Sequence, residues 1–337
     1  MKKFFKYFIL PLFLLAIIAT AVGAYYAYNW SKTPVSLEAS VYDFNIKRGD
    51  SLRSVATKLE GEGILKFADL LILYGRYTGQ DRMIKAGAYE IKAGDTPLDV
   101  LERIASGDMS QRRIALIEGL TTQQFIERIQ SNPDIIVTLD ADNPEELINK
   151  LNIPYDSLEG MFYPDTYVFI PGDTDFDILR RAYVQLQTHL QEAWDSRDPS
   201  IPLKTPYELL IMASIVEKET GLSSDRDTIA GVFMNRLKID MLLQTDPTVI
   251  YGMGDKYEGR IRKVDLQTDT PWNTYTRKGL PPTPIANPGL AAIQAASQPA
   301  EHEYYYFVSR GDGSSEFAKN LREHNQNVRR FILNKED

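Results

Sequence analysis

The stretch Ala213-Ser214-Ile215-Val216-Glu217-Lys218-Glu219-Thr220 decides the fold of the C-terminal part of the chain, because it places two glutamates at the end of an apolar run. Just upstream, residues 205–208 combine a capping threonine, a proline suited to the first helical position and the glutamate of a capping box. Between Leu209 and Val216 only Ser214 is polar. The sequence therefore predicts a helix that is buried on most sides and ends in charged residues.

The two glutamates of this helix face different directions. At about 100° per residue, Glu217 projects on the face of Ala213 and Ser214, whereas Glu219 points nearly the opposite way, with Met212. A carboxyl group in an apolar setting at the negative end of a helix dipole should have a raised pKa, which a general acid working near neutral pH requires. The alternative is that this helix end frays into solvent and has no chemical role.

The composition excludes several kinds of chemistry. The 337 residues are 43% hydrophobic and carry a formal net charge of −8, and no basic stripe indicates a nucleic-acid partner. The absence of cysteine rules out disulfides and thiol catalysis. The three histidines lack metal-binding spacing, and no glycine-rich phosphate loop is present. We therefore expect carboxylate chemistry without a metal or a cofactor.

The N-terminus predicts a membrane anchor. Residues 1–6 include three lysines and precede an apolar run over 7–28, which meets the length of about 20 residues needed to cross a bilayer. Aromatic side chains cluster at its far end. Residues 19–21 also fit the cleavage pattern of a signal peptide, but the apolar run continues past them. The pattern favours an uncleaved single-pass helix in the cytoplasmic (inner) membrane, with the tail in the cytoplasm and the body periplasmic or otherwise extracytoplasmic.

A weak internal repeat follows the linker at 29–40. Residues 46–52 and 91–98 each combine a strand-like entry, a Gly-Asp turn, a capping Ser or Thr and a helical pattern. The first copy resembles a LysM module, a family that binds glycans containing N-acetylglucosamine, and the resemblance covers 41–106. An extra helical segment at 67–77 departs from a minimal LysM, so the alternative is a packing unit without a ligand.

The pattern of elements predicts an α+β protein with a small N-terminal module and a larger catalytic domain. After a connecting segment at 107–155, the catalytic domain is expected to span 156–337 and to contain a long loop with five prolines between 269 and 289. Asn287 is read as the cap of the helix that follows this loop. The chain is expected to close with a strand over 304–309 and a helix over 317–331.

Enzymes that cleave a glycosidic bond with carboxyl groups normally use two of them, one on either side of the bond. Glu217 and Glu219 cannot form that pair, because residues two apart on a helix do not face each other. A partner would have to come from elsewhere, with Asp246 and Glu159 as candidates. Otherwise the reaction needs only one carboxyl group.

The chain resembles the endolytic murein transglycosylase (YceG-like) family over nearly its whole length. The motifs that carry the resemblance occur in the same order, at 159–167, 213–220, 233–237, 243–248, 272–275, 279–289 and 317–325. One departure is Trp272, where a tyrosine is expected. The resemblance implies cleavage of the β-1,4 bond between N-acetylmuramic acid and N-acetylglucosamine in nascent peptidoglycan, without consumption of water. The family's catalytic acid maps onto Glu217.

The resemblance also implies a cleft that binds glycan strands within their length, and termination of strand growth beside the peptidoglycan synthases. Residues with amide, hydroxyl, carboxyl or aromatic groups are expected to contact the substrate, namely Asn235, Gln244, Thr245, Asp246, Asn273 and Tyr275. Glu219 and Ser214 are expected to support Glu217. Several of these residues have structural alternatives: Asn235 can bond nearby backbone, and the Thr-Asp-Pro at 245–247 can form a turn. His324 belongs either to a helix face or to the wall of the site.

Two other functions stay open from the sequence. A muramidase would hydrolyse the same bond and would require a second carboxylate. A non-catalytic scaffold would bind peptidoglycan through the LysM-like module alone.

Overall fold

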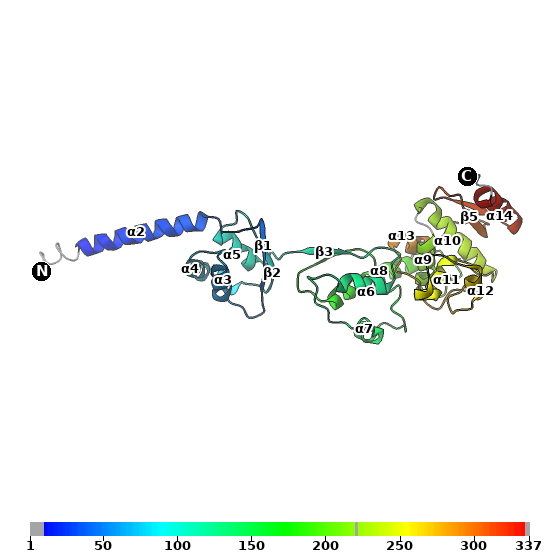
Figure 1. Ribbon diagram of the computed structural model, residues 1–337, viewed down its shortest axis with the longest axis horizontal. Coiled ribbons are helices and arrows are strands. Elements are labelled where there is room, and N and C mark those ends of the chain that lie inside the picture. Colours follow the sequence, from blue (N-terminus) through cyan, green and yellow to red (C-terminus); the bar gives the residue numbers. More distant parts are fainter. Residues whose placement is uncertain (1–9, 220–221, 334–337) are drawn as a thin grey trace. The chain divides into compact units, whose positions relative to one another are not determined.

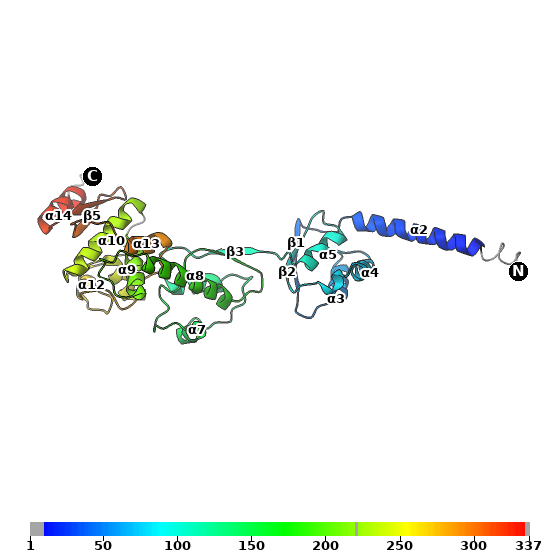
Figure 2. The ribbon, with the colours of Figure 1, turned by 180° about the vertical axis from the view of Figure 1, so that it is seen from behind.

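The computed structural model describes residues 10–219 and 222–333, which form an α+β protein of two compact units (Figures 1 and 2). Among the described residues, one unit comprises 10–112 with 169–172, and the other comprises 113–168 with 173–219 and 222–333. The sequence did not predict that residues 169–172 belong to the first unit. The predicted domain limits at 106 and 155 lie on either side of the change of unit at 112.

The first unit begins with α2 (Leu10–Lys32), a helix that is long and apolar enough to cross a membrane and whose 18-residue apolar window has no buried residue. The module after it contains two strands and three α-helices, in the order β1 (Val41–Ile46), α3 (Leu52–Gly61), α4 (Ala68–Thr78), β2 (Gly87–Lys92) and α5 (Pro97–Ser106). A 3₁₀ turn, Gln80–Arg82, precedes β2.

The internal repeat builds one module, because its two strands pair with each other. β1 and β2 are antiparallel, with Val41 opposite Lys92 and Ile46 opposite Gly87. Phe44 and Ile46 point into a core that they share with residues of α3, α4 and α5. The two copies of the repeat thus cover one hydrophobic core together.

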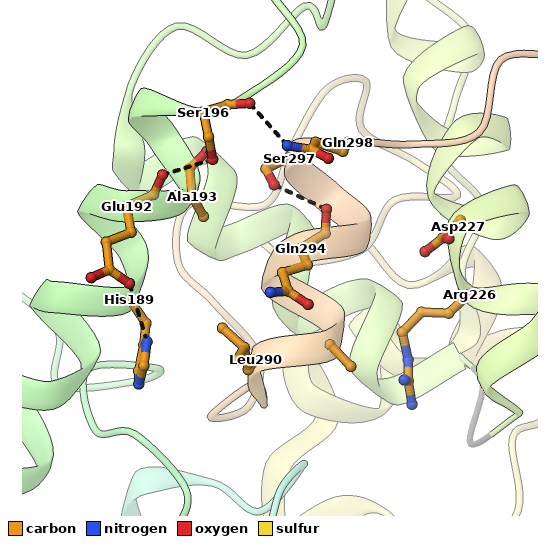
Figure 3. A pocket seen from close by; sticks show the side chains of 11 residues that line it. His189, Glu192, Ala193, Ser196, Arg226, Asp227, Leu290, Gln294, Ser297 and Gln298 are labelled. Atoms are coloured by element: carbon orange, nitrogen blue, oxygen red, sulfur yellow. Dashed lines mark hydrogen bonds and ion pairs between the residues drawn. The ribbon is translucent and has the colours of Figure 1, made fainter.

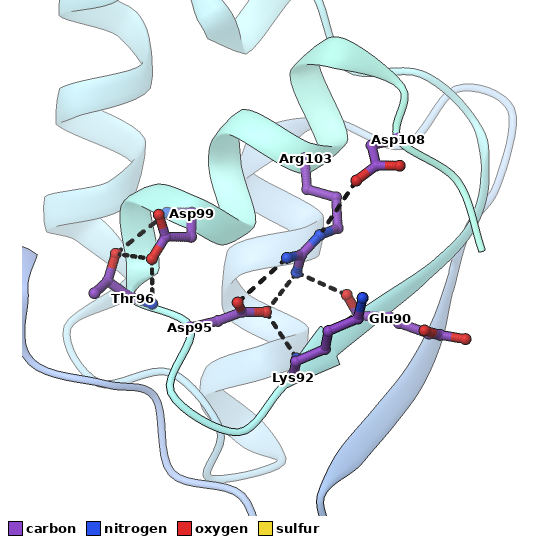
Figure 4. A network of polar contacts seen from close by, with 7 residues as sticks. All are labelled: Glu90, Lys92, Asp95, Thr96, Asp99, Arg103 and Asp108. Atoms are coloured by element: carbon purple, nitrogen blue, oxygen red, sulfur yellow. Dashed lines mark hydrogen bonds and ion pairs between the residues drawn. The ribbon is translucent and has the colours of Figure 1, made fainter.

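The Gly-Asp turns of the repeat have the same local structure in both copies. Asp50 accepts a hydrogen bond from the backbone N–H of Lys47, and Asp95 accepts one from Lys92. Ser51 and Thr96 then cap α3 and α5 with capping boxes. Figure 4 shows how the second turn is fixed further: Arg103 of α5 pairs with Asp95 at 2.5 Å and donates to the carbonyl of Glu90 at 2.8 Å.

The second unit is mainly helical, with short strands at both ends. Strands β3 (Arg112–Ala115) and β4 (Thr166–Phe169) form one two-stranded sheet, and β5 (Tyr306–Ser309) and β6 (Ser315–Ala318) form another. Its α-helices are α6 (Thr122–Gln130), α7 (Pro144–Leu151), α8 (Asp175–Asp195), α9 (Pro206–Glu219), α10 (Ser223–Lys238), α11 (Asp246–Met253), α12 (Lys263–Gln267), α13 (Leu290–Ser297) and α14 (Leu321–Val328). A 3₁₀ turn, Gly254–Lys256, follows α11, and a π-helical turn, Arg329–Leu333, follows α14.

Helix α9 forms the centre of this unit, as its apolar sequence predicts. Every residue from Leu209 to Val216 is buried, and the helix packs against α8, α10, α11 and α13. In Figure 1 it lies among these helices, with α13 beside it. Ser214, the one polar residue of the run, donates to the carbonyl of Ile211 and accepts a hydrogen bond from the N–H of Ile285. The helix is therefore tied to the proline-rich loop.

Two local predictions at the C-terminal side are wrong. The helix expected over 317–331 begins only at Leu321, because residues 315–318 pair with β5 as the second strand of a hairpin. Asn287 does not cap α13, whose N-cap is Gly289. Its fully buried side chain instead joins three segments, as described below.

Candidate active site

Glu217 and Glu219 lie on different sides of the end of α9. Glu217 Oε2 accepts a hydrogen bond of 3.0 Å from the backbone N–H of Gly289, at the start of α13. A side chain at Gly289 would collide with Glu118, whose carboxylate lies against that glycine. Burial raises the pKa of Glu217, the Gly289 N–H opposes this shift, and the charge of Glu118 adds to it. Glu217 therefore lies at a contact between two loops, close to a second carboxylate.

Glu219 points toward the loop that precedes α11. Thr245 donates its hydroxyl hydrogen to Glu219 Oε1. Burial raises the pKa of Glu219 to about 7, the bond from Thr245 and the charge of Arg236 oppose this shift, and the negative charge of Asp246 reinforces it. With a pKa of about 7, both the acid and the carboxylate form of Glu219 are well populated near neutral pH, as a group that acts as acid and then as base requires.

A pocket of about 540 Å³ opens in front of Glu219. Three of the predicted substrate-binding residues line it, namely Gln244, Asp246 and Tyr275. The Tyr275 hydroxyl donates to Asp246 Oδ1 at 2.5 Å. Gln244 has a left-handed backbone conformation with φ of 48°, a costly geometry for a non-glycine residue that is often found at binding sites. The structure thus assembles residues from α9, α11 and two loops around Glu219.

The other predicted site residues hold the framework of this pocket. Thr245 is buried, and its hydroxyl is bonded to Glu219. Asn235 donates to the carbonyls of His302 and Tyr304, at 2.8 and 3.1 Å. Asn273 is fully buried and donates to the carbonyls of residues 265, 266 and 268. Because main-chain carbonyls occupy both amides, we expect Asn235 and Asn273 to shape the pocket rather than contact a substrate.

Three further residues of the pocket were not singled out from the sequence as substrate contacts. Arg236 donates to the carbonyls of Tyr305 and Leu243, and its guanidinium lies 5.4 Å from the centre of the Tyr306 ring. His324 stacks on the same ring at 5.2 Å and lines the pocket, which favours the site-wall alternative for this histidine. Burial and the charge of Arg236 lower the pKa of His324. The sequence did contain an indication of their role, because Arg236 and His324 both lie in motifs that the chain shares with the family it resembles.

Of the two candidates for a second carboxylate, the structure places Asp246 in the pocket and Glu159 elsewhere. Glu159 is buried, with hydrogen bonds from the Thr122 N–H at 2.9 Å and the Tyr251 hydroxyl at 3.1 Å. Burial raises its pKa to about 7. Glu159 therefore joins α6 to α11, whereas Asp246 shares a pocket with Glu219. Over residues 10–219 and 222–333, no group of three acidic or histidine side chains has a metal-binding arrangement.

Comparison with known proteins gives a consistent set of relatives. The model of the YceG-like family matches residues 44–330. A Bacillus subtilis protein named endolytic murein transglycosylase is 32% identical, over 91% of this chain and 87% of the relative. A Streptococcus pneumoniae protein of the same name is 26% identical over 96% of this chain, which spans only 65% of that longer relative. A crystal structure of a putative yceG-like protein from Listeria monocytogenes matches with a TM-score of 0.55 and 30% identity, over 85% of this chain and 98% of the other.

Proposed function

Because the chain belongs to the YceG-like family, we propose that it is an endolytic murein transglycosylase that uses Glu219 as its acid and base. The observation that carries this proposal is the pocket in which Glu219 meets Gln244, Asp246 and Tyr275. The substrate is the glycan strand of nascent peptidoglycan, and the reaction shortens or terminates that strand. By family resemblance, the enzyme works beside the peptidoglycan synthases.

The choice of Glu219 differs from the prediction that Glu217 is the catalytic acid. Support for Glu219 comes from its position on the pocket wall and from a pKa raised to about 7. Glu217 has its Oε2 occupied by the Gly289 N–H, and it lies where the loop at Gly119 meets the start of α13. We therefore assign to Glu217 the role of holding these loops, and keep its catalytic role as the competing hypothesis.

A single carboxyl group can perform the lytic reaction in two steps. Protonated Glu219 first gives its proton to the glycosidic oxygen, and the bond from that oxygen to C1 of N-acetylmuramic acid breaks. The resulting carboxylate then takes the proton of the C6 hydroxyl, whose oxygen bonds to C1. The product is a 1,6-anhydro-muramyl end, and Glu219 regains its proton. Buried hydrogen-bond donors such as the Thr245 hydroxyl stabilise the carboxylate between the two steps.

Hydrolysis of the same bond is the second candidate function, because Asp246 lies in the pocket with Glu219. In a hydrolase Asp246 would activate water or attack the sugar. The variant Asp246→Asn separates the two reactions, since it keeps the shape of the side chain. We expect it to retain lytic activity within about tenfold, whereas loss of a hydrolytic carboxylate costs about 10²- to 10⁴-fold. Mass spectrometry of the new ends identifies the products: 1,6-anhydro ends support the lytic proposal, and reducing ends support hydrolysis.

We propose that α2 anchors the enzyme in the cytoplasmic membrane, with the remainder outside the cytoplasm. The helix is apolar over its 23 residues, and its exposed side chains include those of Tyr25, Tyr26 and Tyr28 near its C-terminal end. Lysines at positions 2, 3 and 6 favour a cytoplasmic N-terminus. This orientation places the catalytic unit on the side of the membrane where peptidoglycan is assembled.

The activity should depend on pH through Glu219. The acid must be protonated in the free enzyme, so kcat/KM should be constant below the pKa of about 7 and fall about tenfold per pH unit above it. Because the charge of Asp246 helps to raise this pKa, Asp246→Asn should move the fall in kcat/KM to lower pH. The measurement is the initial rate at which anhydro ends are released, taken from about pH 5 to about pH 9 so that it brackets this pKa. An alkaline limb that does not move in Asp246→Asn would contradict the assignment to Glu219.

A further inference from the structure

A second cavity lies between three helices of the catalytic unit (Figure 3). It has a volume of about 530 Å³ and is lined by α8, α10 and α13. Arg226 and Asp227 come from the N-terminal part of α10, Glu192 comes from α8, and Gln294 comes from α13. The cavity shares no lining residue with the pocket of Glu219. The charge of Arg226 acts on Glu217 as well, where it lowers the pKa of that carboxyl group against the effect of burial.

Arg226 gives this cavity a specific chemical requirement. Within the described parts of the chain, its buried Nε–H has no hydrogen-bond partner. A buried donor without an acceptor costs about 1–3 kcal/mol, and more when the group is charged. Figure 3 shows Arg226 and Glu192 on opposite sides of Gln294. The lining offers the guanidinium of Arg226, the carboxylates of Asp227 and of Glu192 beside His189, and the amide of Gln294. A ligand that fits it carries a carboxylate for the guanidinium, an amine for the acidic groups and peptide groups for the amide.

We propose that this cavity binds the peptide that murein strands carry, with a peptide carboxylate on Arg226. The proposal rests on the proposed function and deepens it, because it names the part of murein that the second cavity recognises. Neutral sugar hydroxyls do not neutralise a guanidinium, whereas the peptide supplies both carboxylates and amines. The charged lining therefore selects the peptide over the sugars.

The position of the cavity allows one strand to reach both sites. Arg226 and Arg236 lie ten residues apart on α10, which corresponds to about 15 Å along the helix. Arg236 lines the pocket of Glu219, and Arg226 lines the second cavity. At this separation, a glycan held in the first pocket can bring the peptide of a neighbouring sugar to the second.

Murein strands with and without peptides provide the test. We expect Arg226→Gln to raise KM by at least about tenfold on peptide-bearing strands. It should leave kcat and KM unchanged on strands that an amidase has stripped of peptides and whose freed lactyl carboxylates have then been converted to amides. Arg260→Gln, at an exposed arginine outside the cavity, should change neither. Equal changes on both substrates, or none, would overturn the peptide site. If the wild-type enzyme cleaves neither strand, the proposed function fails instead.

Binding of the free peptide by calorimetry gives a readout that does not require cleavage. A Glu219→Gln enzyme should bind the murein tetrapeptide, and the double variant with Arg226→Gln should bind it at least about tenfold more weakly. Equal affinity of the two proteins would overturn the proposal, even if both are inactive. Equal melting temperatures confirm that both variants are folded.

A separate feature of the first unit points to contact with lipid. Helix α4 exposes Leu73 at 66% and Tyr77 at 89%, and Phe67 just before it is 64% exposed. These side chains lie beside the end of α2: Leu73 and Tyr77 share a pocket of about 500 Å³ with Tyr28 and Trp30. Trp30 Nε1 donates a hydrogen bond of 2.6 Å to the backbone carbonyl of Lys66, next to Phe67.

We infer that this face of α4 lies on the bilayer surface. Tyrosine and tryptophan at the end of a spanning helix mark the level of the lipid headgroups. The apolar face of α4 adjoins the aromatic end of α2, since both line the same pocket. It therefore lies at the level of the lipid headgroups. Exposed tyrosine and leucine side chains at this depth contact lipid rather than water.

The cysteine-free chain allows a direct test with spin labels. Nitroxides are placed on full-length Leu73→Cys and Tyr77→Cys in vesicles of phosphatidylethanolamine and phosphatidylglycerol, with Arg48→Cys, at an exposed turn, as the control. We expect oxygen to reach positions 73 and 77 more readily than a water-soluble nickel chelate does, and the reverse at position 48. Greater access for the nickel chelate at all three positions would overturn the lipid contact.

Discussion

Replacing Glu219 with glutamine should reduce murein cleavage by about 10²- to 10⁴-fold, the contribution typical of a general acid and base. The glutamine keeps the size of the side chain and a carbonyl that accepts the Thr245 hydrogen bond. It cannot give a proton to the glycosidic oxygen or remove one from the C6 hydroxyl. The rate at which 1,6-anhydro ends appear, measured by chromatography with mass detection, gives the size of the loss.

Glu217→Gln is the matched control, because it makes the same chemical change two residues away on the same helix. Its amide group still offers an oxygen to the N–H of Gly289. We expect it to retain activity within about tenfold, as for a residue that acts through positioning rather than proton transfer. The opposite result, in which Glu217→Gln is inactive and Glu219→Gln is active, would restore the assignment made from the sequence.

Asn287→Ala should destabilise the catalytic unit by about 2–4 kcal/mol, because it removes a fully buried side chain that joins three segments. Asn287 Oδ1 accepts from the N–H of Phe162, and Nδ2 donates to the carbonyl of Leu120 and to the Thr122 hydroxyl. Without it, the Phe162 N–H is left buried without an acceptor. Chemical denaturation, followed by circular dichroism, measures the change in the free energy of unfolding.

The exposed Asn325 of α14 provides the control for this change. We expect Asn325→Ala to alter the free energy of unfolding by less than about 0.5 kcal/mol. If Asn287→Ala is equally mild, the three-way junction is not what holds the proline-rich loop in place. The loop would then depend mainly on the bond from Ile285 to Ser214.

Local signals made the helices predictable. Thr205 accepts from the Glu208 N–H at the start of α9, and each half of the internal repeat has its capping Ser or Thr. The apolar run from Leu209 to Val216 correctly predicted a buried helix, since all its faces meet other helices. These features depend on neighbours within a few residues, which the sequence displays directly.

Features that depend on distant segments were harder to predict. Residues 315–318 have a sequence compatible with a helix, but pairing with β5 makes them a strand. Helical periodicity separated the faces of Glu217 and Glu219, yet it contains no information on which face meets a pocket. That depends on the loop at 244–246, which brings Asp246 to Glu219. Similarly, Asn287 preceded a helix as a cap would, while its partners lie more than a hundred residues away.

Cleavage in water enriched in heavy oxygen tests the central claim, that one carboxyl group and the substrate's own C6 hydroxyl complete the reaction. Purified wild-type enzyme digests murein in this water, and the new muramyl ends are analysed by mass spectrometry. The lytic mechanism predicts 1,6-anhydro ends that contain no heavy oxygen, in wild-type enzyme and Asp246→Asn alike. Reducing ends that carry heavy oxygen, and that disappear in Asp246→Asn, would contradict it and establish hydrolysis by two carboxylates.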